Sequence, residues 1–440
     1  MLIDCGLFQE RDLRARDWEP FPVQASSIDA ILLTHAHVDH CGYIPRLVKQ
    51  GFEGPIYCNA ATADITKIMV MDTARIQEQD AENKRRRHEK ENRRGPFPEV
   101  PLYTQVDAES CFPQLKPVPY GSFTELGEGV SFKLHDAGHV LGSAMIELKV
   151  RKDGEERVLL FSGDIGRLNR PILRNPTFFE QADYVVMEST YADRDLPDPE
   201  DTLDDFADVI RSTIGAGGNV VIPTFALERS QDVLYYLSKA LYTKKLPPIR
   251  VYLDSPMAVG ITGVFGRYVN LFDAEMQRLM RGKRSPFDFP GLHLISTLDE
   301  SKSIDEVEGP AVVMAGSGMC VGGRVKYNLI SNITRRESTI LFVGYQAEGT
   351  LGRVIADGAG EVRILGQKYP VKARVVQMQG FSSHADCSQL QKWLFNLKRP
   401  PRRVFAVHGE EHSALQLVEL VKQHGWQATA PQYLEEFELD

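Results

Sequence analysis

The stretch ILLTHAHVDHCGYIP, residues 31–45, crowds three histidines and an aspartate into six positions directly after an apolar run. Imidazole and carboxylate groups are the usual ligands of zinc, and a catalytic zinc keeps one coordination position open for water. Residues this close in sequence can share a metal only where the backbone turns sharply, as it does at the end of a strand. His35 with His37 can face one metal, and Asp39 with His40 a second. We therefore predict a metal site on this loop.

Length and composition are those of a large globular enzyme. A chain of 440 residues is too long for one core, so two domains are expected. No apolar run approaches the roughly 18 residues that a membrane span needs, and the N-terminus has no signal-peptide pattern. The formal charge of −9 argues against unspecific coating of a polyanion, although a metal centre with a local basic cleft could still hold phosphates. Six scattered cysteines without a CxxC pair predict reduced thiols and a cytoplasmic location.

The sequence pattern changes twice along the chain. Short β-branched strands separated by Gly, Pro and Asp are expected up to about residue 190. Helices then alternate with buried apolar strands, which is the βαβ pattern of a parallel sheet covered on both faces. Near Val375 the short-strand pattern returns, so we predict that the middle block is inserted into a first domain. We assign the domains as 1–190, 191–375 and 376–440, with the first and last segments forming one α/β domain.

A helical pattern between Ala61 and Arg94 ends in EQDAENKRRRHEKENRR, residues 78–94. This end mixes both charge signs and has almost no apolar stripe. One interpretation is a solvent-exposed helix end with alternating charges. The other is a basic arm that touches nucleic acid.

Three further residues with metal-binding side chains stand at the ends of apolar strands, each beside a glycine that lets the backbone approach closely. They are His139 in DAGHVLGSA, Asp164 in LLFSGDIG and His408 in RVFAVHGEEH. Any one of them alone could be a satisfied core or loop residue. Because the same order of strand, ligand and glycine recurs, we expect these side chains to complete the metal site.

The HxHxDH motif, the later GHVLGS and SGD segments and the opening LIDCG together resemble the metallo-β-lactamase fold, an αββα sandwich. The resemblance implies two zinc ions, each with its own set of histidine and aspartate ligands. One set is His35, His37 and His139, and the other is Asp39, His40 and His408. The resemblance also implies that Asp164 bridges the two ions, with a water or hydroxide between them, and that Asp4 orients the ligand loop from outside.

The inserted block resembles the β-CASP domain of nucleic-acid processing enzymes. Glu188 in VVMESTYADR matches its acidic motif A, His384 in GFSSHAD its motif B, and His408 its motif C, where histidine accompanies RNA substrates. Segments such as IPTFALERSQ and VGYQAEGTLGR resemble the endonuclease subunit of the eukaryotic pre-mRNA 3′-end cleavage complex, and its prokaryotic ribonuclease relatives more closely still. Those relatives carry additional strands before the DCG element. Here Met1 stands three residues before Asp4, so we expect either that the sequence is truncated or that the first sheet lacks its opening hairpin.

The resemblance implies a zinc-dependent endoribonuclease of RNA processing or decay that leaves 5′-phosphate and 3′-hydroxyl ends. Its catalytic residues would be Asp39, His384 as general acid, and Glu188, whose carboxylate raises the pKa of His384 and keeps the imidazole protonated. Three alternatives stay open: 5′-exoribonuclease activity, hydrolysis of a small ester, and a non-catalytic RNA-binding scaffold. The inserted block argues against a small ester, because such a substrate does not need it. The complete ligand set argues against a non-catalytic scaffold, which would be expected to have lost ligands. Single-stranded RNA is the expected partner, no membrane is expected, and a homodimer is compatible with the sequence.

Basic residues of the middle block could line a passage between the domains and contact RNA phosphates. They are Arg229, Arg267, Arg281, Lys283, Arg284, Arg324, Lys326 and Arg353. The glycine-rich GSGMCVGGR, residues 316–324, either offers backbone N–H groups to a phosphate or forms a tight strand-to-helix turn.

Overall fold

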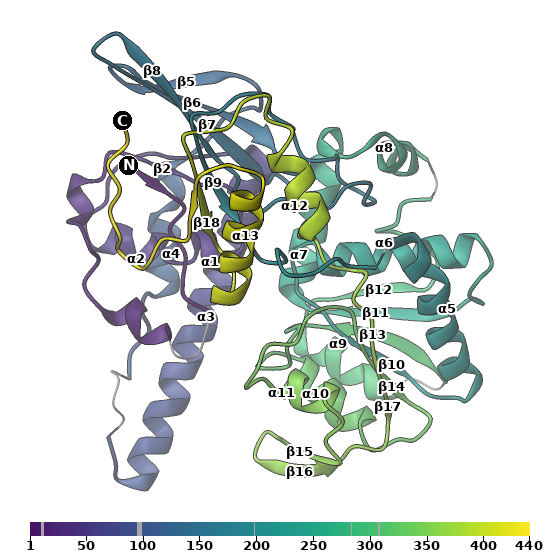
Figure 1. Ribbon diagram of the computed structural model, residues 1–440. Helices are drawn as coiled ribbons and strands as arrows, with labels where there is room; N and C mark the ends of the chain where they lie inside the picture. The colour runs from purple at the N-terminus through teal and green to yellow at the C-terminus, as the bar shows by residue number, and fades with distance from the viewer. Residues whose placement is uncertain (10–12, 95–98, 198, 283, 307–308) are drawn as a thin grey trace. The chain divides into compact units, whose positions relative to one another are not determined.

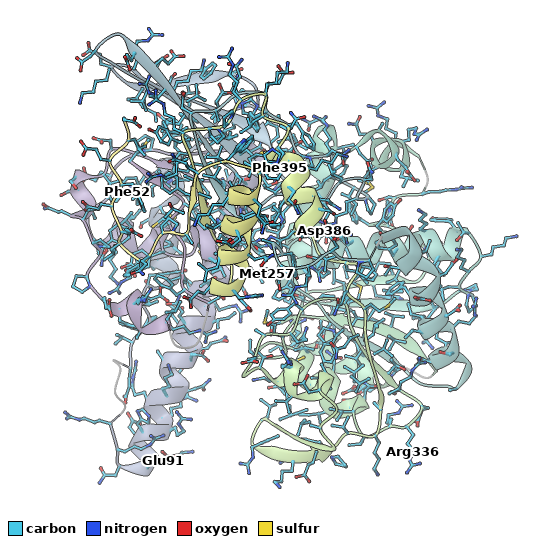
Figure 2. The ribbon with its side chains drawn as sticks, in the orientation of Figure 1. Phe52, Glu91, Met257, Arg336, Asp386 and Phe395 are labelled. Atoms are coloured by element: carbon cyan, nitrogen blue, oxygen red, sulfur yellow. The ribbon has the colours of Figure 1, made fainter. Side chains whose placement is uncertain are left out.

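The chain folds into two compact units, shown as a ribbon in Figure 1 and with side chains in Figure 2. The structure is a computed structural model that describes residues 1–9, 13–94, 99–197, 199–282, 284–306 and 309–440. The first unit comprises Met1–Leu168, Asn175–Arg194 and His384–Asp440. The second comprises Asn169–Arg174 and Asp195–Ser383, and it is inserted in the sequence of the first. Residues 376–383, which the sequence assigns to the first domain, belong to the second unit.

Two sheets pack face to face in the first unit. The first sheet has four parallel strands in the order β1 (Leu2–Ile3), β2 (Ile31–Leu32), β3 (Ile56–Cys58) and β4 (Leu115–Pro117). The second has seven strands in the order β19 (Ala428–Thr429), β18 (Arg403–Val407), β9 (Tyr184–Glu188), β8 (Glu155–Phe161), β7 (Ala144–Lys152), β6 (Val130–Asp136) and β5 (Phe123–Gly127). Leu32 of the first sheet and Phe132 and Ile146 of the second lie in one fully buried cluster between the sheets.

Helices cover the outer face of each sheet of the first unit (Figure 1). Those beside the four-stranded sheet are α1 (Val38–Cys41), α2 (Ile44–Lys49), α3 (Ala60–Glu91) and α4 (Gln105–Ser110). Those beside the seven-stranded sheet are α12 (Cys387–Leu394) and α13 (Glu411–Gln423). Alternate residues of each strand point to opposite faces, so Ile31 packs under the first helices while Leu32 packs between the sheets. The layers are therefore α, β, β and α, which confirms the predicted sandwich.

The second unit is built on one parallel sheet of six strands. Their order is β12 (Leu292–Ile295), β11 (Arg250–Asp254), β13 (Ala311–Ala315), β10 (Val220–Pro223), β14 (Thr339–Phe342) and β17 (Arg374–Gln377). The helices are α5 (Pro199–Gly215), α6 (Arg229–Tyr242), α7 (Pro256–Arg267), α8 (Ala274–Arg281), α9 (Leu298–Ser303), α10 (Val325–Asn332) and α11 (Leu351–Ala356). A hairpin of β15 (Glu361–Ile364) and β16 (Gln367–Pro370) precedes β17. Among the described residues, no helix is long and apolar enough to cross a membrane.

Candidate metal centre

The HxHxDH loop begins where β2 ends and turns into the short helix α1 at Val38. Asp4 holds this loop from behind. Its Oδ1 accepts the backbone N–H of Thr34 at 2.7 Å, and its Oδ2 accepts the Thr34 hydroxyl at 2.8 Å and His40 Nδ1 at 2.7 Å. The Thr34 hydroxyl in turn accepts from His35 Nδ1 at 3.0 Å. Both imidazoles therefore donate from Nδ1 and turn Nε2 toward the centre.

Gly6 lets the N-terminal segment pass directly beside the loop. Its neighbours Cys5 and Leu7 donate backbone N–H groups to the carbonyl groups of His40 and Val38, at 2.7 and 3.0 Å. A Cβ at position 6 would lie 1.5 Å from the Asp39 carbonyl oxygen. Only glycine fits this close approach between two backbones.

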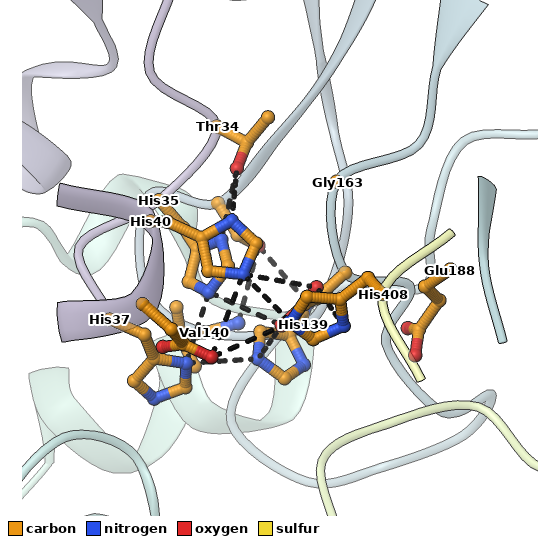
Figure 3. A network of polar contacts seen from close by, with 12 residues as sticks. Thr34, His35, His37, His40, His139, Val140, Gly163, Glu188 and His408 are labelled. Atoms are coloured by element: carbon orange, nitrogen blue, oxygen red, sulfur yellow. Dashed lines mark hydrogen bonds and ion pairs between the residues drawn. The ribbon is translucent and has the colours of Figure 1, made fainter. Parts of the chain in front are cut away.

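A first cluster of donor atoms is formed by His35, His37, His139 and Asp164, whose donor atoms lie within 4.8 Å of one another. His37 Nδ1 lies 3.0 Å from His35 Nε2 and 3.4 Å from His139 Nε2. Asp164 contributes Oδ2, which lies 3.3 Å from His35 Nε2 and 3.4 Å from His139 Nε2. Figure 3 shows His35 and His37 from the loop after β2 converging with His139 from the loop after β6, while Asp164 follows β8.

A second cluster is formed by Asp39, His40 and His408. The two Nε2 atoms of the histidines lie 3.1 Å apart, although 368 residues separate them in sequence. His408 Nε2 also lies 3.5 Å from Asp39 Oδ2. The Oδ1 atom of Asp164 lies 3.4 Å from His40 Nε2 and 3.4 Å from His408 Nδ1. Asp164 therefore faces the first cluster with one oxygen and the second with the other.

The donor set suits metal ions better than it suits a protein core. Asp164 is 2% exposed, and its Oδ1 accepts no hydrogen bond from the described part of the chain. Burial lowers the pKa of His35 and of His139, and it lowers that of His37 to about 3, so these imidazoles are neutral with lone pairs available for a metal. Burial also acts to lower the pKa of His40, but nearby carboxylates outweigh it and raise that pKa to about 9. The same negative field favours a bound cation.

Glu188 and His384 form a third group beside the clusters. Glu188 is fully buried at the end of β9, where Oε1 accepts the Ile165 N–H at 2.5 Å and Oε2 lies 3.0 Å from His384 Nδ1. His384 Nδ1 lies 4.0 Å from Asp164 Oδ2. Burial acts to lower the pKa of His384, but the Glu188 carboxylate overcomes this effect and raises it. This carboxylate therefore favours the protonated form of the imidazole, next to the two donor clusters.

One side of the centre is open. The side chains of Asp39, His408 and His384 are 38%, 33% and 20% exposed, whereas His35 and His139 are completely buried. A ligand therefore reaches the centre over the second cluster and the Glu188–His384 pair.

The structure brings together every site residue predicted from the sequence. They are Asp4, His35, His37, Asp39, His40, His139, Asp164, Glu188, His384 and His408. Sequence reasoning missed Thr34, whose hydroxyl connects Asp4 to His35. The available signal was its position directly before the first histidine of the motif.

The glycine-rich loop of the second unit is a tight turn. Ser317 Oγ accepts the N–H groups of Val321 and Gly322 at 3.1 and 3.3 Å, so these amides are used inside the loop. Among the predicted RNA contacts, Arg324 binds Asp254 at 2.9 Å, and Arg353 binds Asp357 at 2.8 Å. Lys283 lies outside the described residues. The first of the two interpretations, a phosphate-binding loop, gains no support.

Comparison with known proteins identifies three domains along the chain. Residues 1–169 match the metallo-beta-lactamase superfamily domain, residues 230–355 the Beta-Casp domain, and residues 368–431 the Zn-dependent metallo-hydrolase RNA specificity domain. The chain is 35% identical to Ribonuclease TTHA0252 of Thermus thermophilus, covering 98% of this chain and 93% of that protein. It is 32% identical to the transcription termination factor FttA of Methanocaldococcus jannaschii, covering 96% of this chain but only 65% of the relative. An RNase J-like protein of the same archaeon is 29% identical, with 94% and 88% covered.

The αββα sandwich and its convergent histidines and aspartates define a metal-dependent hydrolase. More narrowly, the chain belongs to the β-CASP family of the metallo-β-lactamase superfamily, which confirms the resemblance seen in the sequence.

Proposed function

We propose that this protein is a zinc-dependent endoribonuclease that cuts single-stranded RNA and leaves 5′-phosphate and 3′-hydroxyl ends. The observation that carries the proposal is the Asp164 carboxylate, which has two imidazole nitrogens within 3.3–3.4 Å of each oxygen. A carboxylate placed in this way supports a pair of metals, and paired metals are typical of nucleases and phosphatases. The matched RNA specificity domain and the relative named a ribonuclease support RNA as the substrate.

Each zinc would have three ligands of its own and would share Asp164. The proposed ligands are His35, His37 and His139 for one ion and Asp39, His40 and His408 for the other. Imidazole nitrogens with few carboxylates favour zinc over magnesium or calcium, which prefer oxygen donors. When bound, the two ions supply an activated water and neutralise charge on the phosphate.

The protein's own residues supply the proton for the leaving group. The Ile165 N–H fixes Glu188 Oε1, so Oε2 is left to accept from His384 Nδ1. This hydrogen bond orients the imidazole and leaves its Nε2 proton for the RNA. The proton goes to the 3′-oxygen as its bond to phosphorus breaks, which gives a 3′-hydroxyl on one product and a 5′-phosphate on the other. Asp39 is the third proposed catalytic residue, because its carboxylate lies at the open side where the phosphate arrives.

Product mapping tests this function. Zinc-loaded protein is incubated with a single-stranded RNA labelled at its 5′ end and internally, beside a DNA of the same sequence. Internal RNA fragments with intact DNA are the expected result. The new 5′ ends should be joined by a ligase without kinase treatment, and phosphatase treatment should abolish this ligation. Intact RNA with two zinc ions bound would overturn the proposal.

A 5′-exonuclease is the second candidate, because one relative is named an RNase J-like protein. Release of mononucleotides from the 5′ end, in place of internal fragments, would favour it. The proposal does not include transcription termination, since the chain spans only 65% of the FttA protein of Methanocaldococcus jannaschii. All six cysteines are unpaired thiols, which supports the proposed cytoplasmic location.

A further inference from the structure

The end of α3 carries a strong positive charge on a protein whose formal charge is −9. Residues 84–94, here called the basic arm, contain seven basic and two acidic side chains, an excess of five positive charges. The basic side chains are Lys84, Arg85–Arg87, Lys90, Arg93 and Arg94, and all of them are exposed. Such a contrast between one segment and the whole chain indicates a polyanion as its partner.

The basic arm projects from the first unit and is held in place. α3 has 32 residues, and Glu91 at its end lies far from the core residue Phe52 in Figure 2. The chain that returns from the arm is fixed to the helix, because Glu99 binds His88 Nδ1 and its carbonyl oxygen accepts from Arg85. Nearer the start of α3, the Glu78 carboxylate accepts both the backbone and the side-chain N–H of Gln105. Two of the acidic side chains in this region therefore serve to fix the arm.

Four of the basic side chains are available to a ligand. Arg86 pairs with Glu82, and Arg93 with Glu91. Lys84, Arg87, Lys90 and Arg94 make no ion pair or side-chain hydrogen bond with the described part of the chain. Basic side chains that are not neutralised within the protein can bind phosphates of a nucleic acid. This binding releases the counterions condensed on the nucleic acid, which is the main source of affinity for its backbone.

Helix α3 begins near the metal centre, and the basic arm at its other end lies far from that centre. Near the first turn of α3, the Thr62 hydroxyl donates to the Gly142 carbonyl at 2.7 Å, in the loop that carries His139. At 1.5 Å per helical residue, Lys84 lies about 33 Å along the helix from Thr62. A stacked strand with 3.4 Å between phosphates needs about ten nucleotides to cover that distance. The arm can therefore touch only the part of an RNA that extends beyond the cleavage site.

We propose that the basic arm is a second RNA-binding surface, which holds the phosphate backbone of a long single-stranded substrate about ten nucleotides away from the metal centre. The choice of RNA as the ligand rests on the proposed function. The positive charge and exposure of the basic arm do not depend on that function. The Debye length is about 10 Å at 0.1 M salt, so the charge of the arm does not act on the metal centre directly. Its effect must therefore depend on RNA length.

The test compares two RNA lengths and two sets of substitutions. The arm variant carries Lys84→Gln, Arg87→Gln, Lys90→Gln and Arg94→Gln. The control variant loses the same charge at exposed positions elsewhere in the first unit, through Lys116→Gln, Lys152→Gln, Lys392→Gln and Arg399→Gln. Binding of oligouridylates of 6 and 30 nucleotides is measured by fluorescence anisotropy or competition in excess chelator, which prevents cleavage, over a series of salt concentrations.

We expect the arm variant to bind the 30-nucleotide RNA at least about tenfold more weakly at 0.1 M salt, with a salt slope reduced by up to about 2.8, or 0.7 for each lost phosphate contact. Affinity for the 6-nucleotide RNA should not change, and the control variant should resemble the wild type with both. Equal affinity of the arm variant and wild type for the long RNA would overturn the proposal, and the arm would then suit an acidic protein. An equal loss with both lengths, or the same loss in the control variant, would also overturn it. Cleavage with zinc is scored separately: a protein that binds through the arm but cuts no RNA refutes the proposed function alone.

Discussion

Asp4→Asn is the substitution that most directly tests how the ligand loop is built. Asparagine has nearly the same shape and can still accept the Thr34 N–H through its oxygen. Its amide group, however, cannot accept from both the Thr34 hydroxyl and His40 Nδ1, which now reach Asp4 Oδ2 at 2.8 and 2.7 Å. The imidazole of His40 therefore loses the partner that fixes its tautomer and its orientation.

The magnitude follows from the contact that is lost. A hydrogen bond to a charged group contributes about 1.5–3 kcal/mol, and outer-shell partners of metal-binding histidines typically contribute about 10–100-fold in metal affinity. These two ranges agree, since about 1.4 kcal/mol corresponds to a tenfold change in a binding constant. We expect the loss to fall on the metal ion that we propose for the second cluster, because His40 belongs to that set, whereas Asp4 reaches the first cluster only through Thr34.

The assay is competition for zinc against a chromophoric chelator, fitted with two dissociation constants. Asp4→Asn should weaken one of them by about 10–100-fold and leave the other within about twofold. Thr34→Val is the matched partner: it removes the hydroxyl that accepts from His35 Nδ1, so it should weaken the other site. Asp29→Asn, an exposed carboxylate, controls for charge. Unchanged affinities in Asp4→Asn, or an equal loss at both sites, would refute the reasoning.

Three further substitutions test the acid, the loop and a buried carboxylate. His384→Ala should keep both zinc ions but slow single-turnover cleavage by about 10²–10⁴-fold, and wild-type rates would remove this residue from the mechanism. Gly6→Ala places a Cβ 1.5 Å from the Asp39 carbonyl oxygen, so it should cost about 3 kcal/mol or more and reduce the zinc content. Gly263→Ala, where nothing lies within 4 Å, is its control in calorimetry, and equal melting temperatures would contradict the packing argument. Asp17 is 5% exposed and burial raises its pKa to about 6, so its protonated form favours folding and this stability is lost as the pH rises through 6. Asp17→Asn should therefore stabilise the protein by up to about 3 kcal/mol at pH 8 and by less at pH 5, and an equal gain at both would show that ionisation is not the cause.

The layers of the first unit were predicted through the resemblance to the metallo-β-lactamase fold, whereas the strand pattern alone indicated only short strands there. The sequence did not predict where the inserted unit ends. Val375 looks like the start of another short strand of the first domain, but β17 pairs with β14 in the parallel sheet of the second unit. Phe381 then packs against Phe206 and Tyr236 of that unit. The sequence of a short β-branched strand does not indicate which sheet it joins, since long-range packing determines its partner strand.

The residues predicted for the site lie close together in the structure, although their roles remain predictions. Metal ligands are chemically distinctive residues, and a strand end followed by glycine places them where a sharp turn can present them. The same reasoning could not find Thr34, because threonine is common at strand ends and its role depends on a partner 30 residues away. Nor could it decide the glycine-rich loop, where Ser317 uses the amide groups that a phosphate would need.

Glu188 and His384 lie on either side of the segment that forms most of the second unit. The chain passes into the second unit at Asp195, seven residues after Glu188, and returns to the first unit at His384 itself. The 3.0 Å contact between the two side chains therefore joins the segments on either side of a 189-residue excursion, Asp195–Ser383. The group that we propose as proton donor thus stands at the covalent connection to the inserted unit, while its partner is fixed in the sheet.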